Sequence, residues 1–287
     1  MKVHQQNYDI AEVEKWNNFR NSLSSLFPNR TVAVMNLIDS LSSNFSAKTA
    51  VQLSENDLFN YNYNSLYKGI NSSFSSSSSL RKEQIKLKQE LIVSTLNVSP
   101  KLPFNLLAID ATPLERTHSP TLIDREFVHK PSPIFGQKPI TLGHKYSVLT
   151  YLTSDEKTQH NWSIPLSTER IDSGSTESEI GSEQVNIFLD NCPSDLEDNL
   201  LVITGDSHYS NQYFLGNLTN HQNVVTLTRC RSNRVFYTLP KINNNHQKKR
   251  GHPFWYGDKF SLGDESTWHE VDEEFSTSIT KYEKRDF

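Results

Sequence analysis

Apolar side chains recur at steps of three and four residues through the first hundred positions, the spacing of one face of an α-helix. The first such stripe consists of Ile10, Val13, Trp16, Phe19, Leu23 and Phe27. Pro28 follows and predicts the end of that helix. The same spacing predicts further helices over residues 32–41, 48–70 and 81–96. The serine-rich segment 71–79 predicts a flexible linker. We therefore expect residues 1–100 to form a helical N-terminal region.

From residue 100 onward the apolar runs become short, which predicts buried strands rather than helices. The expected strands cover residues 104–110, 145–152, 160–166, 200–204 and 223–228. Helical patterns recur over residues 177–190 and 211–218. The prolines of residues 111–142 predict a loop. For residues 101–229 we therefore expect an α/β fold, a mixed sheet flanked by helices whose element order is that of the ribonuclease H-like fold.

Two of the predicted strands end in an aspartate. Asp110 follows one apolar run and Asp206 follows another, and Pro113 predicts that the first strand does not continue as a central strand. Adjacent carboxylates repel each other and stay ionised only when cations neutralise them, and hard oxygen ligands favour Mg²⁺ or Mn²⁺. If the two share an ion, we expect their oxygens within about 3–6 Å of each other. The alternative is that each aspartate only caps a turn after its strand.

Composition excludes several classes of protein. The formal net charge of −4 over 287 residues identifies no partner. Cys192 and Cys230 form no CxxC pair, so neither a disulfide framework nor a cysteine-based zinc site is expected. No segment approaches the roughly 18 apolar residues of a membrane span, and residues 1–8 lack the apolar core of a signal peptide. We therefore expect a cytoplasmic protein without a membrane partner.

Several segments together resemble insertion-sequence transposases of the DDE type, which belong to the retroviral integrase superfamily. The matching segments, in chain order, are Leu106-Leu-Ala-Ile-Asp-Ala-Thr-Pro113, Gly143-His-Lys-Tyr-Ser147, Gly205-Asp-Ser-His-Tyr-Ser210, Arg231-Ser-Asn-Arg-Val-Phe-Tyr237 and Gly251-His-Pro-Phe-Trp-Tyr-Gly257. The resemblance implies a ribonuclease H-like catalytic core with Asp110 and Asp206 as the first two catalytic acids. It also implies two Mg²⁺ or Mn²⁺ ions, insertion-sequence ends and target DNA as partners, a homodimer on DNA, and a nucleoid-associated location. The helical residues 1–100 are then candidates for binding DNA ends.

The resemblance has one departure, at the third catalytic acid. The family carries a Glu in a Tyr-x-x-Arg-x-x-x-Glu pattern on a helix after a β-rich insertion, and Tyr282 and Arg285 match only its first half. Residues 276–282 instead alternate like a strand, so we expect residues 230–287 to be the beginning of the insertion. Glu270, Glu273 and Glu274 lie in an acidic run typical of a solvated surface. We therefore expect a C-terminally truncated transposase that does not transpose.

A basic tract precedes that acidic run. Residues 207–257 contain no Asp or Glu, yet they include Arg229, Arg231, Arg234, Lys241, Lys248, Lys249 and Arg250. Cations without neighbouring acids neutralise phosphates, so we expect this tract to bind DNA, chiefly through Arg229, Arg231, Arg234 and residues 248–250.

Two alternative functions also fit parts of the sequence. A haloacid dehalogenase-like phosphatase also begins with an Asp after an apolar strand, and Thr112 fits its motif loosely, but it needs an acid that residues 207–257 lack. A second alternative is a catalytically dead DNA-binding fragment.

Single histidines and tryptophans give weaker signals. His144, His208 and His252 have no metal-ligand spacing, although His208 could contact a phosphate. Trp255 and Trp268 could stack on an unpaired base, but packing within a hairpin is the simpler expectation.

Overall fold

The fold is taken from a computed structural model. The structure describes residues 10–74, 78–95, 103–130, 135–136, 138–154, 161–192, 196, 199–240, 255–274, 276–277 and 285–286. By its internal contacts the chain divides into two compact units, Met1–Thr228 and Arg229–Phe287. Within the part of the chain that is described, no helix has the length and apolar character required to cross a membrane.

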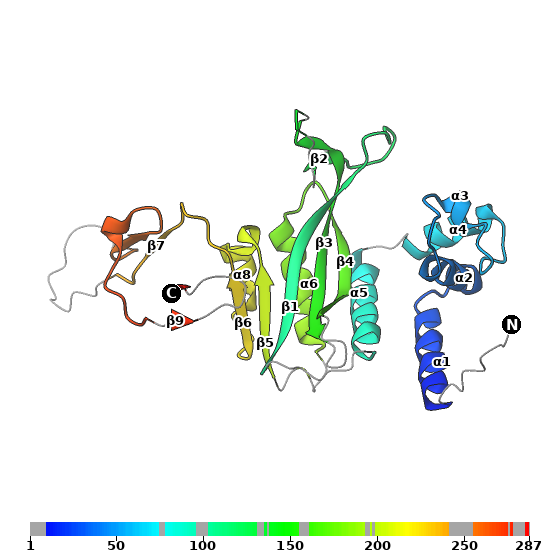
Figure 1. The fold of residues 1–287 in the computed structure, drawn as a ribbon, viewed down its shortest axis with the longest axis horizontal. Helices are drawn as coiled ribbons and strands as arrows, with labels where there is room; N and C mark the ends of the chain where they lie inside the picture. The colour runs from blue at the N-terminus through cyan, green and yellow to red at the C-terminus, as the bar shows by residue number, and fades with distance from the viewer. Residues whose placement is uncertain are drawn as a thin grey trace. The chain divides into compact units, whose positions relative to one another are not determined.

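The N-terminal helices are α1 (Ile10–Ser25), α2 (Thr31–Ser42), α3 (Ala50–Leu53) and α4 (Tyr63–Phe74) (Figure 1). A small core of Leu37, Leu53, Phe59 and Leu66 joins the last three. The single helix predicted over 48–70 is wrong, because α3 and α4 are separate. Asn56 and Asn62 explain the break, since their side chains accept the amides of Leu58 (2.9 Å) and Ser65 (3.1 Å) and so compete with helical hydrogen bonds.

Helix α5 (Ser78–Val93) packs against the sheet domain, although we grouped it with the N-terminal helices. The Gln89 amide nitrogen donates to Ser167 Oγ at 3.4 Å and to the Gln184 carbonyl at 3.3 Å, and all three residues are buried. The predicted linker over 71–79 is wrong for the residues described, because α4 extends to Phe74 and α5 begins at Ser78.

The sheet contains β1 (Phe104–Glu115), β2 (Glu126–His129), β3 (Ile140–Ser154), β4 (Asn161–Ile171), β5 (Leu200–Gly205) and β6 (Val224–Thr228). Strand β3 pairs antiparallel with β1 along one edge and with β2 and β4 along the other. Strands β5 and β6 continue the sheet on the far side of β1 in parallel. The order β4-β3-β1-β5-β6 is that of a ribonuclease H-like sheet, which confirms the predicted fold class.

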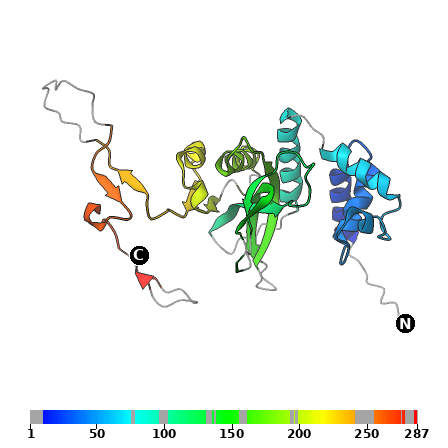
Figure 2. The same ribbon diagram turned by 90° about the horizontal axis from the view of Figure 1, so that it is seen from above.

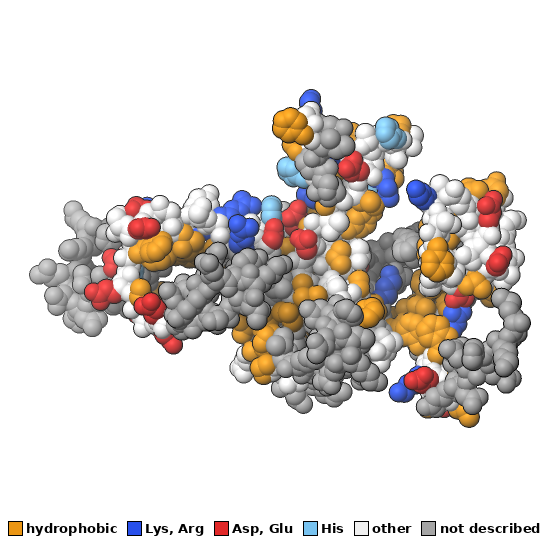
Figure 3. Space-filling view, viewed as in Figure 1, with side chains coloured by type: hydrophobic (Ala, Val, Ile, Leu, Met, Phe, Trp, Pro, Cys, Tyr) orange, Lys and Arg blue, Asp and Glu red, His pale blue; other side chains and the backbone are white. Residues whose placement is uncertain are grey.

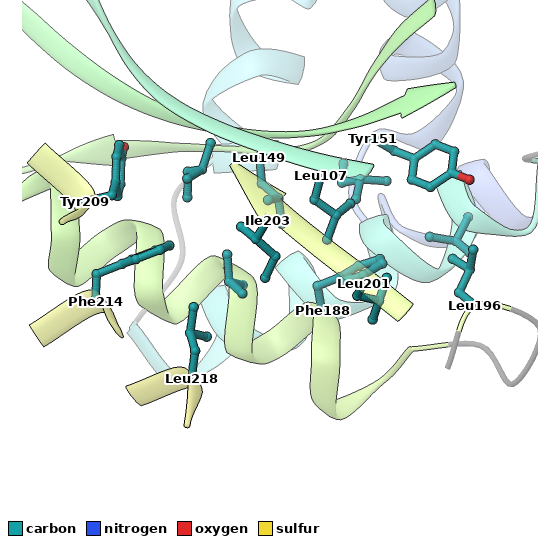
Figure 4. Close-up of a cluster of buried hydrophobic side chains, with 14 residues drawn as sticks. Leu107, Leu149, Tyr151, Phe188, Leu196, Leu201, Ile203, Tyr209, Phe214 and Leu218 are labelled. Atoms are coloured by element: carbon teal, nitrogen blue, oxygen red, sulfur yellow. The ribbon is translucent and has the colours of Figure 1, made fainter. Parts of the chain in front are cut away.

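The main core lies between the sheet and its helices. Helices α6 (Glu177–Asp190) and α8 (Gln212–Leu218) lie with α5 on one face of the sheet, as Figures 1 and 2 show. Their apolar side chains meet those of β1, β3 and β5 (Figure 4). The labelled members of this cluster are Leu107, Leu149, Tyr151, Phe188, Leu196, Leu201, Ile203, Tyr209, Phe214 and Leu218. The helix predicted over 177–190 is confirmed, and the one over 211–218 begins one residue later than expected.

Strand β1 does not end at Asp110, so that prediction is wrong. It continues through Pro113 to Glu115, paired with β3. The parallel pairing with β5 stops at Ile109, so beyond that point β1 has a free edge on the β5 side. Proline is tolerated where one side of a strand has no partner to receive its missing N–H. The loop predicted over 111–142 likewise contains the end of β1, all of β2 and the start of β3.

Gly143 explains why the β1–β3 pairing is close at this point. A Cβ atom on Gly143 would lie 2.3 Å from the Leu114 carbonyl oxygen, a distance that no real side chain shows. The glycine at the head of the segment 143–147 is therefore required by the approach of two backbones.

The second unit contains β7 (Val235–Tyr237), β8 (Lys259–Ser261), the short 3₁₀ helix η2 (Glu265–Thr267), β9 (Ser276–Thr277) and β10 (Arg285–Asp286). Residues 231–239 alternate in sequence like an exposed strand, and of these residues only Val235–Tyr237 form one, β7. Of the strand predicted over 276–282, β9 forms the start and residues 278–282 lie outside the described residues. Trp268 packs on Phe260 and its Nε1 donates to the Ser261 carbonyl at 2.8 Å, which confirms packing within the hairpin. Trp255 is 73% exposed.

Candidate active site at the ends of two parallel strands

The sheet register makes Asp110 and Asp206 neighbours. Ile109 pairs with Gly205 on the adjacent parallel strand, and each aspartate is the next residue along its chain. Gly205 leaves room for the Tyr209 side chain, because an added Cβ atom would lie 3.1 Å from it, a tight contact. Asp206 follows the carboxyl end of β5, the kind of position where ligands bind in open α/β folds, and Asp110 lies on β1 just beyond the last residue that pairs with β5.

Asp206 also begins the turn that follows β5. Its Oδ1 accepts the His208 amide at 2.8 Å, at the start of the 3₁₀ turn η1 (Ser207–Tyr209). The alternative that Asp206 caps a turn is therefore correct for one carboxylate oxygen. A cap that fixes this carboxylate at the strand end does not exclude a second role for its other oxygen.

The neighbouring charges alter the acidity of Asp110. The carboxylate retains solvent exposure, yet partial burial is the largest cause that raises its pKa above the usual range. The backbone amide of Ala111 opposes this shift, whereas the negative charges of Asp206 and Glu177 reinforce it. Asp110 therefore lies in a negative local field that a cation would relieve.

Glu177 is the acid of this cluster that we missed in the sequence. Its Oε1 lies 3.4 Å from the Lys145 ammonium and its Oε2 lies 3.3 Å from His208 Nδ1. Acids in the first turn of a helix usually offset the helix dipole, so Glu177 had no distinctive signal in the pattern of residues 177–190. Only the packing of α6 beside β3 and η1 shows that it faces Asp110.

A capping box holds Glu177 in place. Thr176 Oγ1 accepts the Glu179 amide at 3.3 Å, and the Glu179 carboxylate accepts the Thr176 amide at 2.6 Å. The two reciprocal bonds satisfy donors at the start of α6 and fix the position of its first turn.

The same turn of α6 holds the segment that carries Asp206. Ser178 Oγ donates to the His208 carbonyl at 2.8 Å, and the Asn211 amide donates to both that carbonyl (2.8 Å) and Ser178 Oγ (2.5 Å). Buried Tyr209 stacks edge-on against Phe214 with ring centroids 5.0 Å apart. The carboxylate pair is therefore mounted on rigid elements.

Of the three histidines singled out in the sequence, His144 and His208 lie within the described residues and have different surroundings. His144 is 5% exposed, and its Nε2 lies 3.1 Å from the Ile123 carbonyl and 3.0 Å from Arg170 Nη2. It is therefore a core residue and not the surface residue that we expected. His208 is half-exposed and lies beside Glu177. His252 lies outside the described residues.

Acidic side chains gather next to a histidine on the face drawn in Figure 3, above the strands of the first unit. Among the described residues, however, no group of three or more His, Cys, Asp or Glu side chains is arranged to hold a metal ion. The donor chemistry nevertheless suits a divalent cation, because carboxylate oxygens are hard ligands and the charges of Asp206 and Glu177 act on Asp110.

The predicted DNA-binding residues belong to the second unit. Arg229 and Arg231 are exposed and Arg234 is half-buried. Residues 248–250, the other half of the predicted set, lie outside the described residues.

Comparisons with known proteins agree with the predicted class. A family model described as DDE superfamily endonuclease matches residues 22–286. The Mos1 transposase paired-end complex with left transposon end is 12% identical, with a TM-score of 0.25, over 71% of this chain and 60% of that one. The Mos1 mariner paired end complex with Mn is 12% identical, with a TM-score of 0.24, over 79% of this chain and 69% of that one. These scores are too low to transfer individual residues. A comparison with curated proteins finds no match.

Proposed function

Because the chain belongs to the DDE superfamily endonucleases, we propose that it is a transposase that cuts and joins DNA, with Asp110 and Asp206 as catalytic carboxylates. The observation that supports the proposal is the register of β1 and β5, in which Asp110 and Asp206 each follow a residue of the last parallel pair, Ile109 and Gly205. Such an arrangement suits transfer of a phosphodiester to water or to a DNA 3′-hydroxyl.

The carboxylates of Asp110 and Asp206 would hold the Mg²⁺ or Mn²⁺ ions. When bound, these ions stabilise the attacking and leaving oxygens of an in-line displacement at phosphorus. The chain's own part is to orient the carboxylates, which the Asp206 cap and the first turn of α6 support. Lys145 and His208 flank Glu177 beside this pair and would contact non-bridging phosphate oxygens.

The remaining partners follow from this proposal. The basic tract, chiefly Arg229, Arg231, Arg234 and residues 248–250, would bind the phosphates of transposon ends and target DNA. A homodimer would bring two ends together, and residues 1–100 would contribute to end recognition. Association with DNA would place the protein at the nucleoid.

A catalytically dead DNA-binding protein is the second candidate. It is favoured by the absence, within the described residues, of three side chains arranged around a metal site. The phosphatase alternative has no such support, because residues 207–257 supply no acid after Asp206.

The test is cleavage of a supercoiled plasmid that carries both genomic flanks of the reading frame, in Mn²⁺ and in EDTA. The transposase proposal predicts nicks at the flanks that require Mn²⁺ and disappear in Asp206→Ala. Asp190→Asn, which removes an acid at the far end of α6, should cut like the wild type. Gel-shift binding of the flanks without any nicking would instead support the DNA-binding protein, and absence of both would reject the proposal.

A further inference from the structure

A pocket lies next to Asp110 and Asp206. It has a volume of about 960 Å³ and lies between the first turn of α6 and the helix α8. Lys145, Glu177 and His208 form the wall that it shares with the candidate active site. The remainder of its lining includes Ser178, Glu179, Asn211, Gln212, Tyr213 and Gly216. The proposed substrate must therefore pass beside this pocket, which we call the α6–α8 pocket.

The charges of the α6–α8 pocket are already neutralised within the protein. The Lys145 ammonium lies between Glu126 (3.6 Å) and Glu177 (3.4 Å). The Glu179 carboxylate is held in the capping box of α6, so the backbone donors of that helix start are covered. A phosphate inside the pocket would meet the Glu177 and Glu179 carboxylates, because the only cationic side chains of its lining, Lys145 and His208, lie on the wall shared with the candidate active site. The pocket therefore suits an uncharged polar group.

The side of the pocket formed by α8 offers an aromatic surface and unused polar groups. Tyr213 is 58% exposed, and within the described part of the chain neither its hydroxyl nor the Gln212 amide makes a hydrogen bond. The Asn211 amide is already used, because it bonds Ser178 and the His208 carbonyl. An added Cβ on Gly216 would meet only Gln212 Cγ, at 3.9 Å, so the glycine leaves space along this wall.

We propose that the α6–α8 pocket binds the base of an unpaired nucleotide of a DNA strand that lies beside Asp110 and Asp206, with Tyr213 as its stacking surface and Gln212 as a contact to the base edge. A nucleobase is flat, uncharged and rich in donors and acceptors, which matches this lining, and base–aromatic stacking tolerates any base. The inference relies on the proposed function for DNA as the ligand, but not on cleavage.

The experiment uses the full chain, EDTA, and a duplex with a three-nucleotide 3′ overhang that carries 2-aminopurine, a fluorescent base quenched by stacking. We expect the wild type to quench the probe, and Tyr213→Ala to abolish quenching and weaken overhang binding about tenfold or more, the range of a lost stack. Tyr213→Phe should retain both effects. Gly216→Met should fill the pocket and reduce quenching, whereas Gly216→Ala should not. Phe127→Ala, which removes an exposed aromatic side chain of β2, is the matched control.

The outcomes separate this proposal from the proposed function. Quenching that persists in Asp206→Ala, together with a lack of Mn²⁺ cleavage by the wild type, would retain the base pocket and reject the nuclease. Equal quenching by wild type and Tyr213→Ala, or no quenching by the wild type, would overturn the pocket. Quenching of free 2-aminopurine riboside as strong as that of the overhang would also overturn it, because the site would then bind nucleosides and not a DNA strand.

Discussion

At the scale of single residues, Asp110 shows how the fold makes a carboxyl group harder to ionise. Its raised pKa means that ionisation is harder in the folded chain than in the unfolded one, through partial burial and the charges of Asp206 and Glu177. The folded protein then binds more protons than the unfolded chain in the interval between the two pKa values. Stability therefore falls as pH rises through that interval, and the deficit remains at neutral pH.

Asp110→Asn should consequently raise the melting temperature at pH 7. The free energy of unfolding should rise by less than about 1 kcal/mol, because solvent screens an exposed carboxylate. It should vanish once the pH is below the unfolded pKa of Asp110, where wild type and variant are both neutral. Calorimetry from pH 3 to pH 8 would measure this, with Asp190→Asn as the control. A variant less stable than wild type at pH 7 would contradict the account.

Glu177 acts at the same scale through its two ion pairs. Glu177→Gln keeps the shape of the side chain but removes the charge that holds Lys145 and His208. If these groups position the phosphate, we expect single-turnover cleavage to slow by up to about 10²-fold, the effect of a small misplacement, while DNA affinity changes little. Combining it with Lys145→Met should add less than the product of the single effects. Fully multiplicative effects would show that the two residues act independently.

At the scale of elements, the first turn of α6 connects the helix layer to the segments that carry the two candidate catalytic acids. Gly181 lets this helix approach closely: an added Cβ would lie 2.8 Å from Ile109 Cδ1 and 2.8 Å from Tyr209 Cε1. Ile109 precedes one candidate catalytic acid and Tyr209 follows the other. The spacing between α6 and β1 therefore sets the position of both aspartates.

The same substitution in two helices should have opposite effects on stability. Gly216→Ala in α8 meets open space and should stabilise by about 0.5–1 kcal/mol through helix propensity. Gly181→Ala gains the same propensity but overpacks the core, which costs about 1–3 kcal/mol. The free energy of unfolding measured in urea should therefore be about 1–3 kcal/mol lower for Gly181→Ala than for Gly216→Ala. Equal midpoints would mean that the core relaxes around the new methyl group.

At the scale of the whole molecule, charge is distributed unevenly along the chain. Residues 207–257 hold seven Lys and Arg residues and no acid, although the protein as a whole carries a net charge of −4. Phosphate neutralisation releases counterions, so DNA affinity should depend steeply on salt concentration.

Replacing Lys248, Lys249 and Arg250 by Ala should lower the slope of log affinity against log salt by up to about three phosphate equivalents. Fluorescence anisotropy on labelled duplexes from 50 to about 200 mM salt would measure the slope. Lys15→Ala with Lys68→Ala, two exposed lysines of the N-terminal helices, provides the comparison and tests whether residues 1–100 also bind DNA. An unchanged slope in the triple variant would make the tract a solvated loop.

Much of the architecture could be predicted from the local spacing of apolar residues. Helical spacing located α6, short apolar runs located β1, β3 and β5, and the alternation of elements predicted a ribonuclease H-like sheet. These features are local, because the period of apolar residues reflects how a single element faces its core. Asp110 and Asp206 could be singled out for the same reason, since each follows an apolar run.

Only the tertiary structure decided which elements become neighbours. The register of β1 with β5 places the two aspartates side by side, and the free edge beyond Ile109 lets β1 continue through Pro113. The approach of α6 adds Glu177 to the acidic cluster. The sequence by itself determined the elements and the kind of chemistry that their acids favour. Strand register and helix placement decided which acids meet, because these are set by contacts between residues far apart in the chain.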